Sequence, residues 1–284
     1  MTKPNPTRTL AGLLVPCLMI AACATADRSA TKRASAESRA ALEAGDSKEA
    51  LDRYARAYAE NPRNKALAAG YVRAIEEIKR AADQALGRKE YGGASNTYGH
   101  LLDHYEGLGP LAEGLSFDKA ALQTALKTSR AALVDLQVQR DLKEGAFAKA
   151  LKLRADAVKA DPRDAGLAAK YQETVIAIKV RGDKALDEKD FARAGAANAL
   201  LLNQAATIEA LRPPVGFTRD ALKNTVSICR ENLTGAGLEE YRKGNLAKAI
   251  AIWESLLAFD PDNAEIQKAV TTARTQLDAL KKKE

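Results

Sequence analysis

The residues best spaced for chemistry are the two histidines, His100 and His104, which stand four positions apart beside Asp103. On a helix this spacing places both imidazoles on one face, where they could hold a metal ion. One hundred residues later, in a matching stretch, the same two positions are Leu200 and Gln204. Because the second stretch lacks the pair, we expect surface or partly buried histidines and no metal site. The sequence also lacks a glycine-rich phosphate loop and a nucleophile elbow, so we expect no catalytic residue and no cofactor.

Cys23 is the second residue whose surroundings suggest chemistry. Lys3 and Arg8 precede an apolar run from Leu10 to Ile20, which is too short to span a bilayer comfortably and is typical of a secretory signal peptide. The run is followed by Ala21-Ala22-Cys23, and Ile-Ala-Ala-Cys resembles the lipobox of bacterial lipoproteins. In that family the cysteine is diacylated on sulfur and becomes the mature N-terminus.

The resemblance to lipoproteins also implies a location. It implies that residues 1–22 are a signal peptide that is removed and that residues 23–33 are a lipidated, flexible tether. Two or more acyl chains hold a protein on a membrane surface without a spanning helix. Since Ala24 rather than aspartate follows the cysteine, the family pattern favours the outer membrane, facing the periplasm. The alternative is a plain signal peptide cut at Ala22 or after Ala24, with Cys23 incidental.

Composition narrows the class of protein. The chain is 46% hydrophobic, 29% charged and 5% aromatic, which is typical of a globular, helix-rich protein. The formal net charge is +7, and acidic residues are interspersed among the basic ones throughout the chain. We therefore expect no nucleic-acid partner. Once the leader is removed and Cys23 is lipidated, Cys229 is left alone, and we expect it to be a buried thiol without a disulfide.

One pattern recurs three times, at offsets of 100 and 99 residues. The copies are GDSKEALDRYARAYAENP at Gly45–Pro62, GAFAKALKLRADAVKADP at Gly145–Pro162 and GNLAKAIAIWESLLAFDP at Gly244–Pro261. Each copy resembles the second half of a tetratricopeptide repeat, in which glycine opens the turn between two helices and proline closes the second helix. At the large position in the middle of each copy, Trp253 is expected in the core, whereas Arg154 departs from the aromatic pattern.

The shared register extends over units of about 100 residues. We expect super-repeats at residues 34–133 and 134–233, each a regular hairpin plus a degenerate one, and a final hairpin with a capping helix at residues 234–284. Each super-repeat contains a long helical pattern, at Asn64–Lys89 and Asp164–Lys189, that starts with a capping residue. A single helical hairpin buries only one stripe of its apolar side chains, so the hairpins must stack on one another to complete a core. The expected fold is all-α, a right-handed tetratricopeptide-like solenoid of about eleven helices.

Two segments with glycine or proline interrupt the helical pattern, at residues 106–115 and 206–217. We expect both to be loops. Their apolar residues either tuck back over the helix junction or form a tip that binds a partner. The matched apolar spacing in the two segments favours packing over the junction.

In tetratricopeptide proteins the first helix of each hairpin lines a groove that holds a partner's peptide. Carried over by position, the resemblance places these residues in the groove: Arg39, Leu42, Gln139, Leu142, Lys143, Leu238, Tyr241 and Arg242. We therefore expect a non-enzymatic adaptor that binds an envelope protein or peptide, in pilus or secretin assembly, barrel assembly or polysaccharide export. It would contact the membrane only through its lipid and would have no small-molecule substrate. The alternative is a glycan- or peptidoglycan-associated structural lipoprotein, because fold does not decide function.

Overall fold

The computed structural model describes residues 32, 33 and 35–281, and all regular secondary structure in this range is helical. No helix within these residues is long and apolar enough to serve as a membrane span. The predicted leader and Cys23 lie outside the described residues. Contacts between Cα atoms divide the chain after Leu133 into two compact units, called unit 1 and unit 2 below.

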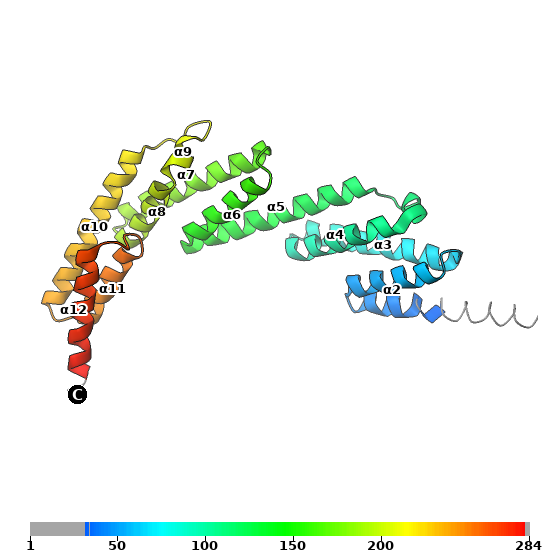
Figure 1. The fold of residues 1–284 in the computed structure, drawn as a ribbon, viewed down its shortest axis with the longest axis horizontal. Coiled ribbons are helices and arrows are strands. Elements are labelled where there is room, and N and C mark those ends of the chain that lie inside the picture. Colours follow the sequence, from blue (N-terminus) through cyan, green and yellow to red (C-terminus); the bar gives the residue numbers. More distant parts are fainter. Residues whose placement is uncertain (1–31, 34, 282–284) are drawn as a thin grey trace, which may run out of the picture. The chain divides into compact units, whose positions relative to one another are not determined.

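Unit 1 is a row of helices that pack on their neighbours in sequence (Figure 1). Residues 35–43 form its first described helix. The following elements are α2 (Ser47–Glu60), α3 (Lys65–Gly87), α4 (Tyr91–Tyr105), the 3-10 helix η1 (Glu106–Gly114) and the start of α5 (Lys119–Glu144). α3 packs against both α2 and α4, which is the sequential packing of a solenoid.

Unit 2 begins in the second half of α5 and is also a row of helices (Figure 1). Its further elements are α6 (Phe147–Ala160), α7 (Ala165–Asp187), α8 (Phe191–Asn203), α9 (Ala205–Glu209), α10 (Arg219–Arg242), α11 (Leu246–Leu257) and α12 (Ala264–Lys281). Packing is again sequential, from α6 on α7 to α11 on α12. The predicted all-α, solenoid-like fold is confirmed for the described residues.

Helix boundaries agree closely with the sequence pattern because local capping sets them. Asn64 accepts hydrogen bonds from two amides in the first turn of α3, both at 3.1 Å. Asp164 does the same at the start of α7, at 2.9 and 3.3 Å. The two long helices end two residues before Lys89 and Lys189, whose φ angles of 64° and 60° are left-handed and cannot continue a helix.

Three glycines make the turns that start the repeated pattern. Gly45, Gly145 and Gly244 have φ angles of 80°, 79° and 80°. Glycine adopts this left-handed region without the steric penalty that a Cβ atom brings. The recurrent glycine of the sequence pattern is therefore explained by backbone conformation.

Gly244→Ala is expected to lower the free energy of unfolding by about 1–2 kcal/mol, because alanine is strained at positive φ. Gly235→Ala, inside α10, is the matched control and is expected to raise it by up to about 1 kcal/mol. A Cβ atom at either position meets nothing within 4 Å, so only the backbone is tested. Urea unfolding followed by the fluorescence of the single tryptophan measures both. Shifts of the same sign would contradict this account.

Each unit has its own hydrophobic core. In unit 1 the core contains three buried tyrosines, Tyr54, Tyr71 and Tyr98. In unit 2, Trp253 is only 3% exposed, which confirms its expected core position. Gly237 makes room for it, since a Cβ atom there would lie 2.2 Å from the indole Nε1. Cys229 is buried as expected, and burial raises the pKa of its thiol to about 11.

The two interrupting segments are less irregular than the sequence predicted. The first is the 3-10 helix η1, broken at Gly109 with a φ angle of 51°, and the second begins with the short helix α9. Leu108 and Ile208 are buried in the cores of their own units. An ion pair also ties each segment to the first residue of the next helix: Glu106 to Lys119, and Glu209 to Arg219. The packing interpretation is therefore the correct one for these leucine and isoleucine side chains.

Candidate functional site

Two cavities lie beside helices that start a hairpin, one in each unit. The cavity in unit 1, called the N-terminal socket, has a volume of about 350 Å³. Its lining residues are Arg39, Leu42, Glu43, Tyr54, Gly70, Arg73, Ala74 and Glu77. The cavity in unit 2, called the C-terminal socket, has a volume of about 310 Å³. Its lining residues are Thr234, Leu238, Tyr241, Trp253, Glu265, Ile266, Lys268, Ala269 and Thr272.

The two sockets occupy the same position in the repeat. Adding 199 to the number of an N-terminal lining residue gives the C-terminal one in five cases. The pairs are Arg39 and Leu238, Leu42 and Tyr241, Tyr54 and Trp253, Gly70 and Ala269, and Arg73 and Thr272. The repeat therefore builds a cavity with an aromatic floor in its first and third copies.

Small residues leave space beside the aromatic floors, which are themselves largely buried, with Tyr54 6% and Trp253 3% exposed. Tyr54 stacks on Tyr71 with ring centroids 5.7 Å apart. A Cβ atom on Gly70 would lie 3.3 Å from the Tyr54 ring, so a longer side chain there would cover it. In unit 2 the rings of Tyr241 and Trp253 lie 5.8 Å apart.

In the middle copy, charged side chains occupy the equivalent place. Arg154 replaces the aromatic floor and is 6% exposed, with its Nη1 2.7 Å from Oδ1 of Asp135. Lys170, at the position of Gly70, forms an ion pair with the same carboxylate. Burial disfavours the charged form of Asp135, but hydrogen bonds from Lys170 and Arg154 outweigh it and hold the pKa of Asp135 below its usual value. We call these three residues the middle-copy ion cluster.

The aromatic is absent from the middle copy for a steric reason. The position that is Gly237 beside Trp253 is Val138 in the middle copy, and Val138 is fully buried. Since even a Cβ atom at Gly237 would overlap the indole, a valine there excludes a tryptophan ring at position 154. The slender side chain of Arg154 fits, and its charge requires Asp135 as a partner.

The structure divides the predicted groove residues into three groups. Arg39 and Leu42 line the N-terminal socket, and Leu238 and Tyr241 line the C-terminal socket. Gln139, Lys143 and Arg242 are exposed. Leu142 was wrongly placed in the groove, since it is 1% exposed and packs in the core of unit 2. Residue spacing alone could not distinguish the side of α5 that faces the core from the side expected to face the groove.

Several lining residues were missed by the sequence interpretation. Tyr54 was treated only as the large residue of the pattern, and Glu43, Arg73 and Glu77 were not singled out. One signal was available in the sequence. Eight residues after the proline of the repeat, the first copy has Gly70 and the second copy has Lys170. A small residue that alternates with a long one at the same register indicates a space that is open in one copy and filled in the other.

His104 contacts protein groups through both ring nitrogens. Its Nε2 lies 3.0 Å from Oδ1 of Asp52, and its Nδ1 lies 3.4 Å from the hydroxyl of Tyr71. Burial, with the Asp52 charge adding to it, raises the pKa of Tyr71 to about 12. Within the described residues no cluster of three or more metal-ligating side chains occurs. His104 thus links α2, α3 and α4, while His100 is half-buried.

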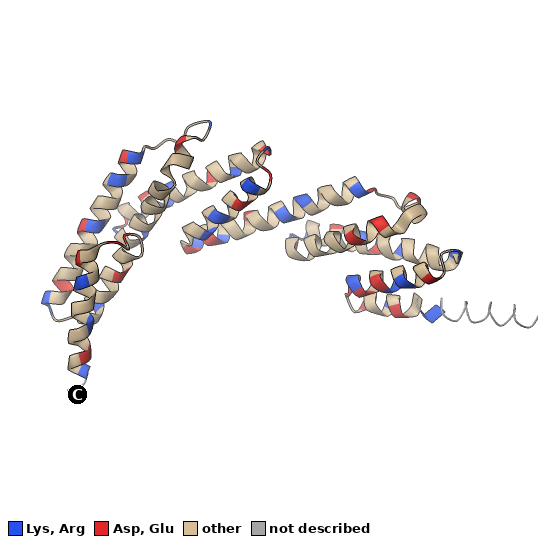
Figure 2. Ribbon diagram, in the orientation of Figure 1, with Lys and Arg blue, Asp and Glu red and all other residues tan. Residues whose placement is uncertain are grey.

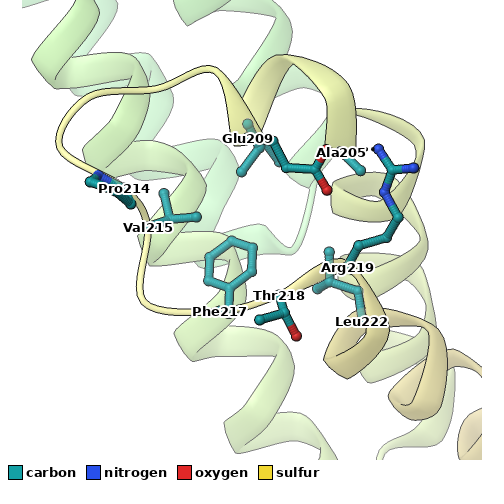
Figure 3. Close-up of a pocket in the computed structure, with 9 residues that line it drawn as sticks. Ala205, Glu209, Pro214, Val215, Phe217, Thr218, Arg219 and Leu222 are labelled. Atoms are coloured by element: carbon teal, nitrogen blue, oxygen red, sulfur yellow. Dashed lines mark hydrogen bonds and ion pairs between the residues drawn. The ribbon is translucent and has the colours of Figure 1, made fainter.

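A further cavity of about 250 Å³ lies under the segment between α9 and α10 (Figure 3). Val215, Phe217 and Leu222 give it apolar walls. The ion pair between Glu209 and Arg219, 2.9 Å long, belongs to its lining. Because this pair joins the two helices that flank the segment, we interpret the cavity as a packing gap beneath the connection between α9 and α10.

Charges of both signs alternate along helices such as α2 and α3 (Figure 2). Many of them are ion pairs one turn apart, such as Arg53 with Glu49 and Lys79 with Asp83.

A scan against protein-family models finds no match for the chain, and a search of curated proteins finds none either.

Proposed function

We propose that this protein is a non-enzymatic, tetratricopeptide-like scaffold that is held on the outer membrane by lipid at Cys23 and docks a protein of the cell envelope. The observation that carries the proposal is the recurrence of one socket at equivalent positions in the first and third copies. In the middle copy Arg154, Asp135 and Lys170 fill the equivalent place, so an open socket is not a general consequence of the repeat. Both sockets also include residues that the tetratricopeptide resemblance places in a partner groove.

The lining of the C-terminal socket supports a protein partner. Leu238 is 39% exposed, although it is a large apolar side chain next to Tyr241. Aromatic residues with exposed leucine suit the apolar anchor of a partner, since buried anchors supply most of the binding energy in interfaces. Glu265 and Lys268 at the same socket provide polar contacts at the edge.

Photo-crosslinking in cells tests this docking role. A photoreactive amino acid at position 42 or 238 is expected to give an adduct with one and the same envelope protein. The matched control is position 280, where a leucine is 55% exposed but lines neither socket. Leu238→Glu serves as a further test: loss of the adduct formed from position 42 would mean that one partner contacts both sockets. Adducts with glycan strands instead of protein would replace the proposal with the polysaccharide-associated alternative.

The lipid anchor is tested separately. Cys23→Ser is expected to remove the protein from the outer-membrane fraction, because serine cannot carry the thioether-linked lipid that holds the protein there. Cys229→Ser, at a buried thiol, is the control that leaves the fractionation unchanged. Retention of the Cys23→Ser protein in the outer membrane would contradict the anchor.

A further inference from the structure

The N-terminal socket carries four charged residues, Arg39, Glu43, Arg73 and Glu77. Within the described residues none of the four forms an ion pair. Elsewhere on these two helices, Glu37 pairs with Arg33 and Arg53, and Asp83 pairs with Lys79. The socket therefore holds charges of both signs that are available to a ligand.

These charges are sorted into two ends of the socket. The helix over residues 35–43 runs antiparallel to α2, as the ion pair between Glu37 and Arg53 across the turn at Gly45 requires. α2 is in turn antiparallel to α3, as the stack of Tyr54 on Tyr71 across the next turn requires. The two outer helices are therefore parallel to each other. On each of them the arginine comes first and the glutamate follows four residues later.

The consequence is a dipolar cavity. The backbone positions of Arg39 and Arg73 lie at one end, and those of Glu43 and Glu77 lie at the other, about 6 Å away along the helix axes. Tyr54 and Leu42 form the apolar part of the lining. A ligand that satisfies all of these groups needs an acidic group and a basic group one helical turn apart, with an apolar side chain beside them.

The dipolar arrangement is not a general consequence of the repeat. At the same four positions the C-terminal copy has Leu238, Arg242, Thr272 and Gln276, and the middle copy has Gln139, Lys143, Glu173 and Ala177. Neither copy repeats two arginines followed by two glutamates. The charge pattern therefore belongs to the N-terminal socket alone and makes it the more selective of the two sockets.

We infer that the N-terminal socket binds a helical segment of a partner protein in which a glutamate is followed by a leucine three residues later and a lysine four residues later. The inference rests on the proposed docking function and specifies the chemistry of the partner. The glutamate pairs with Arg39 and Arg73, the lysine pairs with Glu43 and Glu77, and the leucine contacts Tyr54 and Leu42. A helix supplies this spacing because residues four apart lie on one face with a rise of about 6 Å.

The test uses the full chain in mild detergent and three labelled, alanine-based helical peptides. The first contains Glu-Ala-Ala-Leu-Lys, the second replaces its lysine with glutamate, and the third replaces its glutamate with lysine. Fluorescence anisotropy is expected to show the first peptide binding about tenfold more tightly than the other two, since two favourable charge contacts are replaced by repulsion. Added salt is expected to reduce the difference. Equal affinities for the three peptides would overturn the inference.

Charge reversal in the protein makes the test specific to this socket. Glu43→Lys with Glu77→Lys is expected to transfer the preference to the peptide with two glutamates. Arg39→Glu with Arg73→Glu is expected to transfer it to the peptide with two lysines. The matched control is Lys143→Glu with Glu173→Lys, which changes the corresponding exposed positions of the middle copy and is expected to leave the order unchanged. If neither reversal changed the order, the inference would be wrong.

Failure of this inference is distinguishable from failure of the docking function. If position 238 still crosslinks to one envelope protein while the three peptides bind equally, the docking proposal stands and only the dipolar recognition is wrong. If no protein crosslinks from position 42 or 238, the docking proposal itself fails.

Discussion

Trp253→Ala is expected to lower the free energy of unfolding of unit 2 by about 3–5 kcal/mol, the range for removing a buried aromatic side chain. Trp253 is 3% exposed and packs with Ile250, Leu256 and Ile266 in the cluster formed by α10, α11 and α12. The space left by the indole cannot close easily, because Gly237 on α10 contributes no side chain to fill it. The same change removes the floor of the C-terminal socket.

Circular dichroism during urea unfolding measures this effect, because the variant has no tryptophan fluorescence. Leu280→Ala is the control, since Leu280 is 55% exposed and such a substitution is expected to stay within about 0.5 kcal/mol. Two units can unfold in separate transitions, so the transition that shifts must be identified. An unchanged midpoint for Trp253→Ala would show that α11 does not pack as described.

Arg154→Ala is expected to lower the free energy of unfolding of unit 2 by about 2–3 kcal/mol. Removing one partner of a buried ion pair leaves an uncompensated charge, which typically costs about 3–5 kcal/mol. We place the effect below that range because Asp135 keeps Lys170 as a partner and is itself partly exposed. Lys152→Ala, two residues earlier on the exposed face of α6, is the matched control and is expected to have little effect.

Replacing the whole middle-copy ion cluster is expected to be far less harmful than breaking it. The triple variant Asp135→Thr, Arg154→Met, Lys170→Ala leaves no unpaired charge, and an apolar side chain of similar length replaces the arginine. We expect its unfolding midpoint in urea to lie closer to that of the unmodified protein than the midpoint of Arg154→Ala. If the triple variant were the less stable of the two, the cluster would be a net source of stability rather than a substitute for an aromatic floor.

Local signals in the sequence determine most of the helix boundaries. The first copy of the pattern, Gly45–Pro62, brackets α2, with the glycine two residues before its start and the proline two residues after its end. Asn64 and Asp164 were recognisable as caps because a capping side chain bonds to amides two and three residues away. Such contacts lie within one turn of the chain, and the sequence therefore contains all the information that they need. Lipidation of Cys23, outside the described residues, stays a prediction.

The sockets could not be derived in this way, because their geometry depends on residues that are distant in sequence. Asp135 meets Lys170 across 35 positions, and His104 meets Asp52 through the packing of α4 on α2. Leu142 illustrates the limit: spacing placed it among groove residues, and only the packing of unit 2 shows that it faces the core.

What the sequence alone determined was the repeat, its turns, its caps and the all-α class, since these follow from periodicity and from contacts within a few residues. The tertiary structure decided how the open and filled copies are built, although Gly70 in the first copy against Lys170 in the second was a signal in the sequence. That outcome depends on pairs such as Gly237 with Trp253 and Val138 with Arg154, in which one helix determines the space available to a side chain on the next. Shape complementarity between helices is a property of the packed chain, and no single stretch of residues specifies it.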